Sequence, residues 1–108
     1  MEEIMNLYDN SSWVDAPEYP DGTKKKVLHD EKGVTTYVLN IPKNFKMAAH
    51  SHITSEQHFI LKGEYHSDGK EYPEGSFRFF KAHEEHGPFE SKNGALVLVI
   101  WYPFETGK

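Results

Sequence analysis

Apolar and polar side chains alternate along most of the chain with a period of two, which is typical of strands that bury one face. This pattern predicts strands over residues 13–14, 26–29, 34–41, 45–52, 57–65, 70–72, 76–80 and 95–102. Turn residues separate these runs, and Asn93-Gly94 is a strong hairpin signal. No segment has the periodicity of a long helix. Eight or nine short, evenly spaced strands predict an all-β sandwich or barrel.

Two glycines are expected to shape this pattern. Residues 57–65 form the most apolar central strand, and we expect Gly63 to close it. Residues 30–33 are predicted to form a hairpin loop in which Gly33 adopts a positive φ.

The first twelve residues differ from the alternating region. Ile4, Leu7 and Tyr8 have helix-like spacing, but the segment soon breaks at Asn10-Ser11-Ser12. We interpret it as one turn of helix or as an arm that packs on the domain or on a partner. The sequence therefore predicts a single domain over residues 1–108, with an arm at 1–12 and a barrel at about 13–102.

Composition narrows the classes of function. A chain of 108 residues has room for one modest core, and its seven Phe, six Tyr and two Trp suit a small β-structure. The net charge is −5, and the only basic run is 24–26, which we interpret as a solvated strand start. Nucleic acid is therefore not an expected partner. The chain contains no cysteine, which excludes disulfides and thiolate metal ligands.

The N-terminal residues also bear on location. Residues 1–10 are acidic and only mildly apolar, which fits neither a signal peptide nor a membrane span. We therefore expect a cytoplasmic protein.

A candidate metal site lies in the middle of the sequence. His50 and His52 would point to the same face of an extended strand, and a turn over 53–55 would bring Glu56 beside them. Two imidazoles and a carboxylate are a ligand set for non-haem iron or zinc. Such a site usually takes another ligand from a distant strand, and His83 and His86 are the candidates. The alternative is a chance His-x-His pair in a chain with seven histidines.

The spacing of these residues resembles that of the cupin superfamily, whose motifs are G-x5-H-x-H-x3,4-E-x6-G and G-x5-P-x-G-x2-H-x3-N. The first motif is met at His50, His52, Glu56 and Gly63, and the second at Gly75 and His86. The chain departs from the motifs at four positions, which are Asn44 for glycine, Lys81 for proline, His83 for glycine and Glu90 for asparagine. Asn44 can still adopt a left-handed turn.

The resemblance implies a fold and a ligand set. It implies a single-domain cupin β-barrel, a jelly roll also described as a double-stranded β-helix. The implied ligands of one divalent metal ion per chain are His50, His52, Glu56 and His86, and the metal is Fe²⁺ or Zn²⁺, with Mn²⁺ or Ni²⁺ as alternatives. Within the superfamily, the chain looks most like the ChrR-like group. That group includes zinc-binding anti-sigma sensor domains and small dioxygenases of diketones and hydroxyacetophenones.

Other polar residues are open to several interpretations. His58 should share the inward face with Glu56, so it could be a fifth ligand, a core histidine or the catalytic base, which is the role we assign to it. His83 is expected at the rim. His29 and His66 are expected at hairpin ends, and Glu84 and Glu85 as solvated charges or as groups that orient His86. Three aromatic residues are expected in the core or the pocket wall: Tyr37, Phe79 and Trp101.

Two functions from different classes follow. The first is a dioxygenase-type oxidoreductase that acts on a small oxygen-rich molecule of the diketone or phenolic ketone class. The second is a non-catalytic zinc-binding sensor or binding module. A metal-free carbohydrate-binding barrel is less consistent with four ligands.

The sequence also favours a homodimer. Apolar residues lie on both faces of the strands around Phe59 and Val97, more than one small barrel interior can absorb. The alternative is that the N-terminal arm covers one face within the same chain.

Overall fold

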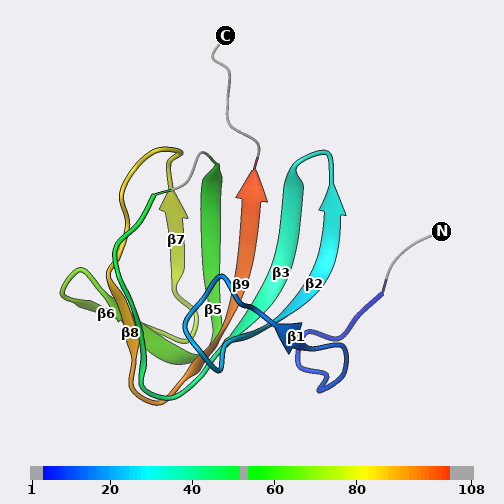
Figure 1. Cartoon of the computed structure of the whole chain (residues 1–108), viewed down its shortest axis with the longest axis horizontal. Helices are drawn as coiled ribbons and strands as arrows, with labels where there is room; N and C mark the ends of the chain where they lie inside the picture. Colours follow the sequence, from blue (N-terminus) through cyan, green and yellow to red (C-terminus); the bar gives the residue numbers. More distant parts are fainter. Residues whose placement is uncertain (1–3, 52–53, 103–108) are drawn as a thin grey trace, which may run out of the picture.

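The computed structural model describes residues 4–51 and 54–102, and its regular structure there consists of strands (Figure 1). The strands are β1 Val14–Asp15, β2 Lys24–Glu31, β3 Val34–Ile41, β4 Phe45–Met47, β5 Ser55–Ser67, β6 Lys70–Pro73, β7 Phe77–Phe80, β8 Phe89–Ser91 and β9 Ala95–Tyr102. The predicted all-β class is therefore confirmed. No helix in these residues is long and apolar enough to cross a membrane.

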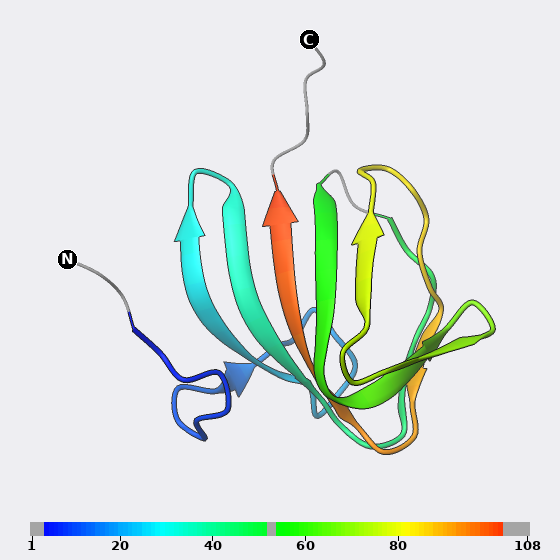
Figure 2. The ribbon, with the colours of Figure 1, turned by 180° about the vertical axis from the view of Figure 1, so that it is seen from behind.

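The strands form one curled antiparallel sheet. The main path runs β1-β2-β3-β9-β5-β8-β4, and β6 and β7 each pair with β5. Four long strands, β2, β3, β9 and β5, form one wall together with the shorter β7, and β4, β6 and β8 curl away from it to form the other (Figures 1 and 2). The side chains between the two walls form the core, which contains Tyr37, Leu39, Ile41, Phe45, Ile60, Tyr65, Phe80, Phe89, Ala95, Val97 and Val99.

Strand β5 belongs to both walls. Its first part pairs with β9 and β7, and residues 64–67 pair with β6. Gly63, with a φ of 75°, marks the change, next to a bulge between Ile60 and Lys62. The expectation that Gly63 closes this strand was wrong. A glycine with positive φ bends the strand here and lets the backbone of Gly94 approach closely.

The predicted strand at 45–52 is also shorter than expected. Strand β4 ends at Met47, where it pairs with Phe89 of β8, a short strand that the sequence pattern did not reveal. Pro88 follows on the partner side, and because proline has no N–H, it cannot continue the ladder. The pairing resumes as one isolated bridge between His50 and His86, which keeps the register of the Met47–Phe89 pair.

The lysine run is not a uniformly solvated strand start. Lys26 is only 2% exposed, and its Nζ donates hydrogen bonds to the carbonyl oxygens of Asp9 (2.6 Å) and Asn6 (3.4 Å). The same ammonium lies 4.8 Å from the centre of the Trp13 ring, a cation–π contact. Lys26 therefore fastens the N-terminal segment to the outer side of β2. Ile4 and Tyr8, which were candidates for covering a sheet face, are 80% and 54% exposed.

The corner in β5 generates a stability prediction. Gly63 and Gly69 have nearly the same φ, 75° and 80°, but an added Cβ at Gly63 would overlap the carbonyl oxygen of Gly94, whereas one at Gly69 would have nothing within 4 Å. We expect Gly69→Ala to lower the free energy of unfolding by about 1 kcal/mol, the cost of the left-handed backbone alone. Gly63→Ala should cost about 1–3 kcal/mol beyond that, because backbone atoms must move. Denaturant unfolding of both variants measures the difference, and equal losses would contradict a tightly packed corner.

Candidate metal centre

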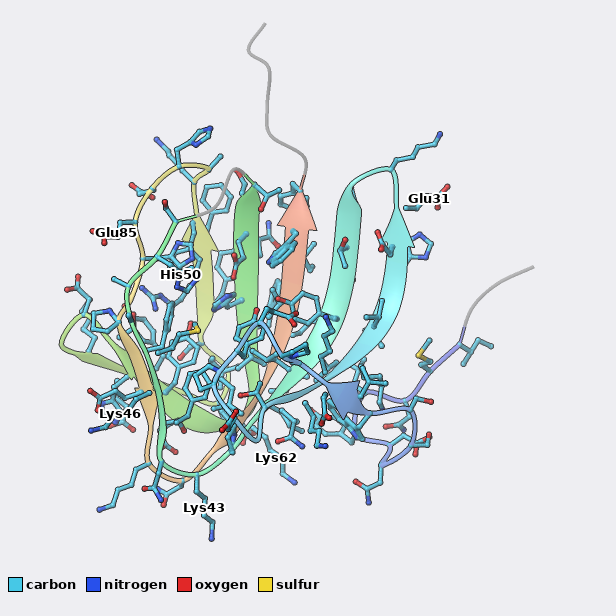
Figure 3. All side chains as sticks on the ribbon, viewed as in Figure 1. Glu31, Lys43, Lys46, His50, Lys62 and Glu85 are labelled. Atoms are coloured by element: carbon cyan, nitrogen blue, oxygen red, sulfur yellow. The ribbon has the colours of Figure 1, made fainter. Side chains whose placement is uncertain are left out.

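Three of the four expected ligands lie near one another at one end of the barrel. His50 lies on the segment that links β4 to β5, Glu56 lies near the start of β5, and His86 lies shortly before β8. Glu56 and His86 are 3% and 6% exposed. His50 lies on the inner side of its segment, whereas Glu85 lies at the periphery (Figure 3). The fourth expected ligand, His52, lies outside the described residues.

The backbone fixes His50 against His86. The N–H of His50 donates to the carbonyl oxygen of His86 at 2.9 Å, and the N–H of His86 donates to that of His50 at 2.8 Å. Residues opposite each other in such a pair direct their side chains to the same face. The ring centres of His50 and His86 are 4.6 Å apart. The isolated bridge therefore places one histidine of each sequence motif side by side.

The two oxygens of Glu56 face different histidines. Oε2 lies 2.5 Å from Nε2 of His58, and Oε1 lies 3.9 Å from Nε2 of His86. A carboxylate that is nearly excluded from water is stabilised by nearby donors, and here Nε2 of His58 lies within hydrogen-bonding distance, whereas Nε2 of His86 lies beyond it. Phe80 lies against both histidines, with its ring centre 4.3 Å from that of His86 and 4.9 Å from that of His58.

His58 is part of a longer chain of polar contacts. Its Nδ1 lies 2.7 Å from the hydroxyl of Tyr65, and that hydroxyl accepts a hydrogen bond of 3.5 Å from Arg78. Burial raises the pKa of Tyr65 to about 12, even though the Arg78 guanidinium acts to lower it. Sequence reasoning placed His58 on the inward face, as found, but it missed Tyr65 and Arg78 as its partners.

A small cavity adjoins these groups. It has a volume of about 20 Å³, which is room for about one water-sized particle. Its lining includes His50, Glu56, His58, Tyr65, Met47 and Tyr19. Tyr19 comes from the loop between β1 and β2, and its hydroxyl is 2.5 Å from that of Tyr37. Burial raises the pKa of both phenols far above the ordinary value, so both stay protonated at neutral pH.

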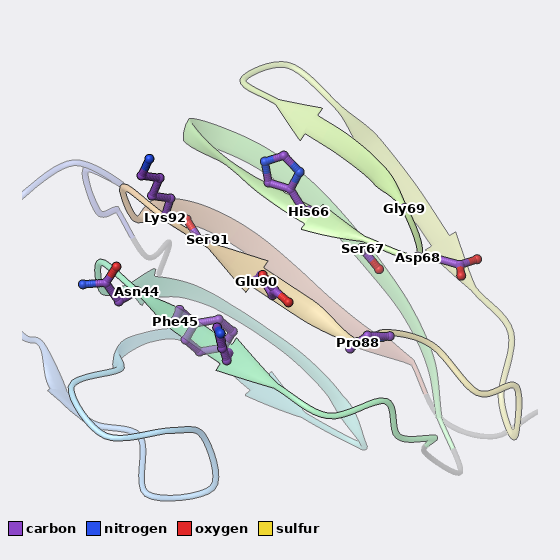
Figure 4. A pocket seen from close by; sticks show the side chains of 11 residues that line it. Asn44, Phe45, His66, Ser67, Asp68, Gly69, Pro88, Glu90, Ser91 and Lys92 are labelled. Atoms are coloured by element: carbon purple, nitrogen blue, oxygen red, sulfur yellow. The ribbon is translucent and has the colours of Figure 1, made fainter.

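A larger groove lies away from this centre. Its volume is about 510 Å³, and its polar lining includes Asn44, Lys46, His66, Glu90 and Lys92 (Figure 4). Among the described residues, His50, Glu56 and His86 do not line it. The Asn44 backbone has a φ of 60°, so this residue adopts the left-handed turn expected where the motif has glycine.

The remaining candidates lie apart from the centre. His83 is exposed on its turn, as expected, and Glu84 accepts a hydrogen bond from the backbone N–H of Lys81 rather than contacting His86. Tyr37 is buried in the core, and Trp101 packs against it. Phe79 was expected in the core or the pocket wall, but it is 50% exposed because alternation along β7 turns it outward.

The donors present suit a divalent cation. Imidazole nitrogens and a carboxylate are ligands that Fe²⁺ and Zn²⁺ accept. Within residues 4–51 and 54–102, however, no three His, Asp or Glu side chains converge as a metal-holding group. The expected set of four includes His52, which lies outside this range, so the assignment of all four ligands stays a prediction.

A comparison with known protein families shows which family this chain belongs to. Residues 1–105 match the ChrR cupin-like domain. The chain belongs to this family. The membership of the chain in the ChrR cupin-like family confirms the resemblance found in the motif spacing. Cupins generally bind a metal ion. No curated protein sequence matches the chain.

Solved structures show the same fold. An acetylacetone dioxygenase from Acinetobacter johnsonii aligns with a TM-score of 0.79 at 20% identity, over 94% of this chain and 74% of that one. An RmlC-like cupin from Shewanella frigidimarina aligns with a TM-score of 0.76 at 20% identity, over 98% and 97% of the two chains. The predicted cupin jelly roll is therefore confirmed.

A third structure bears the family's name. It is the Rhodobacter sphaeroides SigE in complex with the anti-sigma ChrR, which aligns with a TM-score of 0.72 at 17% identity. The alignment covers 87% of this chain and 51% of that one, so the chain spans about half the length of its match. At such identities the likeness shows the fold alone.

Proposed function

We propose that this cupin binds one divalent metal ion through His50, His52, Glu56 and His86. The observation that supports the proposal is the bridge between His50 and His86, which brings imidazoles from two distant motifs to one face beside the buried carboxylate of Glu56. Neither histidine lies in a named strand, but the backbone bridge holds both more rigidly than free loop positions would be held. We also propose a cytoplasmic location, as expected from the sequence.

Metal content tests the ligand set. Protein purified without added metal should contain close to one divalent ion per chain, and His86→Ala should lose most of it, because a nitrogen donor is removed. His83→Ala is the matched control, since His83 lies three residues away and is exposed. Elemental analysis measures the occupancy, which should also fall in mild acid because ligating imidazoles must be deprotonated. Full occupancy in His86→Ala would remove His86 from the ligand set.

We further propose that the metal supports a dioxygenase-type reaction on a small oxygen-rich molecule, of the diketone or phenolic ketone class. A bound ferrous ion would supply open positions for a chelating substrate and for dioxygen, which is the oxidant. The residues of the chain would exclude bulk water, because Tyr65, Phe80 and Phe89 enclose the site. His58 lines the cavity as a candidate base, but both of its ring nitrogens are engaged, Nε2 by Glu56 and Nδ1 by Tyr65, so it would first have to give up one of these hydrogen bonds.

One observation favours the second candidate, a non-catalytic zinc-binding module. The cavity of about 20 Å³ holds a water-sized particle and is too small for a diketone. A substrate could enter only after displacement of wall residues such as Tyr19 on its loop or Met47 at the end of β4. A closed tetrahedral zinc site needs no such movement.

Oxygen uptake separates the two candidates. Iron-loaded protein should consume dioxygen when small β-diketones or phenolic ketones are added, and His86→Ala prepared in the same way should not. An oxygen electrode measures the rate for each compound. If no compound in the panel causes uptake while the melting temperature still rises with bound metal, the binding module replaces the enzyme.

We also propose that two copies pair through the outer face of the long-stranded wall. Phe59 and Phe77 are cross-strand partners on this face, with ring centres 5.0 Å apart, and Leu98 is the partner of Phe59 on the other side. Phe77 and Phe79 are 54% and 50% exposed. Exposed aromatic patches of this kind commonly mark protein interfaces.

Light scattering tests this pairing. We expect a dimer at high micromolar concentration, and Phe77→Lys should shift it toward monomer, because a charge would be buried at the interface. Val27→Lys is a matched control. Val27 is also an exposed apolar residue (44%), but it lies on β2, at the opposite edge of the wall from β7. A wild-type monomer at this concentration would rule out the dimer.

A further inference from the structure

Four side chains form a continuous polar chain through the barrel interior. It runs from Glu56 to His58 (2.5 Å), from His58 to Tyr65 (2.7 Å) and from Tyr65 to Arg78 (3.5 Å). The first three are 3%, 7% and 1% exposed. Polar groups buried this deeply remain in a fold when their partners satisfy them, so the order of donors and acceptors along the chain can be worked out.

The chemistry of the two ends sets the direction of the hydrogen bonds. An ionised carboxylate only accepts, so Nε2 of His58 must carry a hydrogen and donate it to Glu56. A guanidinium only donates, so the Tyr65 oxygen accepts from Arg78. The single hydroxyl hydrogen of Tyr65 is then directed at Nδ1 of His58, which accepts it. This pattern requires the neutral His58 tautomer with hydrogen on Nε2.

The surroundings keep Tyr65 suited to this role. Its pKa of about 12 keeps the phenol protonated, and therefore able to donate, at neutral pH. The Arg78 guanidinium lies over aromatic rings, 4.1 Å from the centre of Tyr72 and 4.6 Å from that of Phe80. These contacts hold the cation beside the Tyr65 oxygen. The bend at Gly63 lets His58 and Tyr65 meet, although both lie on β5.

We propose that Tyr65 is a positioning residue that fixes the tautomer of His58. In this tautomer, Nε2 of His58 holds Oε2 of Glu56 by a hydrogen bond. The other oxygen, Oε1, which lies on the side of His86, is then the one presented to a metal. The proposal rests on the metal site proposed above. It assigns His58 a role in orienting a ligand, in addition to any part in proton transfer. Partners that orient metal-binding side chains typically contribute 10–100-fold to metal affinity.

Removal of one hydroxyl tests the proposal. Tyr65→Phe should lower the affinity for Zn²⁺ by about tenfold or more in titration calorimetry. Tyr72→Phe is the matched control, because its ring packs on Tyr65 and Arg78, with centres 5.7 Å apart for the two tyrosines, and the Arg78–Tyr65–His58 hydrogen bonds do not include it. We expect Tyr72→Phe to bind zinc as the wild type does. Circular dichroism verifies that both variants keep the fold.

The nitrogen NMR shifts of the His58 ring give a readout that loss of packing alone would not change. Metal-free wild-type protein and Tyr72→Phe should show hydrogen on Nε2 and a bare Nδ1, whereas Tyr65→Phe should show a mixture of the two tautomers. The proposal is overturned if Tyr65→Phe keeps both the wild-type tautomer and the wild-type affinity. It is also overturned if the wild-type ring carries its hydrogen on Nδ1, a result that needs no variant to fold.

These outcomes are separate from failure of the metal function. A wild-type protein that binds no zinc, iron or manganese would overturn the proposed metal site, and with it the effect of Tyr65 on affinity. The tautomer comparison would still decide whether Tyr65 holds His58.

Discussion

The carboxylate of Glu56 is the constraint on which the rest of the site depends. It is nearly excluded from water, and an ionised group in that position is stable only when donors surround it. The barrel places an imidazole on each side of it, with His58 at hydrogen-bonding distance from one oxygen and His86 3.9 Å from the other. Aromatic rings, Phe80 and Phe89 among them, fill the remaining space and keep bulk water out. A cation bound beside Glu56 would further stabilise its ionised form.

Much of the fold was predictable from alternation along the chain, because most of the wall strands bury one face and expose the other. The hairpin at Gly33 and the left-handed turn at Asn44 followed from local backbone chemistry, and both were found. Strand β8 was missed because three residues after a proline carry almost no periodic signal. The length of β4 depends on Pro88 of its partner strand, and a pattern read along one strand does not include its neighbour.

For the site, motif spacing pointed to His50, Glu56 and His86, and the structure places His86 near each of the other two. It could not identify Tyr65, and the reason is the bulge between Ile60 and Lys62. Before the bulge the even-numbered residues of β5 face inward, and after it the odd-numbered ones do. Counting by two from Glu56 would place His66 inside, yet His66 is exposed and Tyr65 is buried. One inserted residue thus hid the hydrogen-bonding partner of His58 from any argument based on periodicity.

The bridge between His50 and His86 also bears on how such sequences can diverge. The position of His86 is set by backbone pairing from the side of β8, through Phe89, and not by the exposed turn that precedes it. Residues 81–85 could therefore change in identity, and even in number, while the two imidazoles kept their places. Lys81 and His83 stand where the superfamily motif has proline and glycine, and His83 keeps the positive φ (68°) that glycine readily adopts. In this barrel, the position of His86 depends on its distance along the chain from β8, the strand that follows it, and not on its distance from the strand that precedes it.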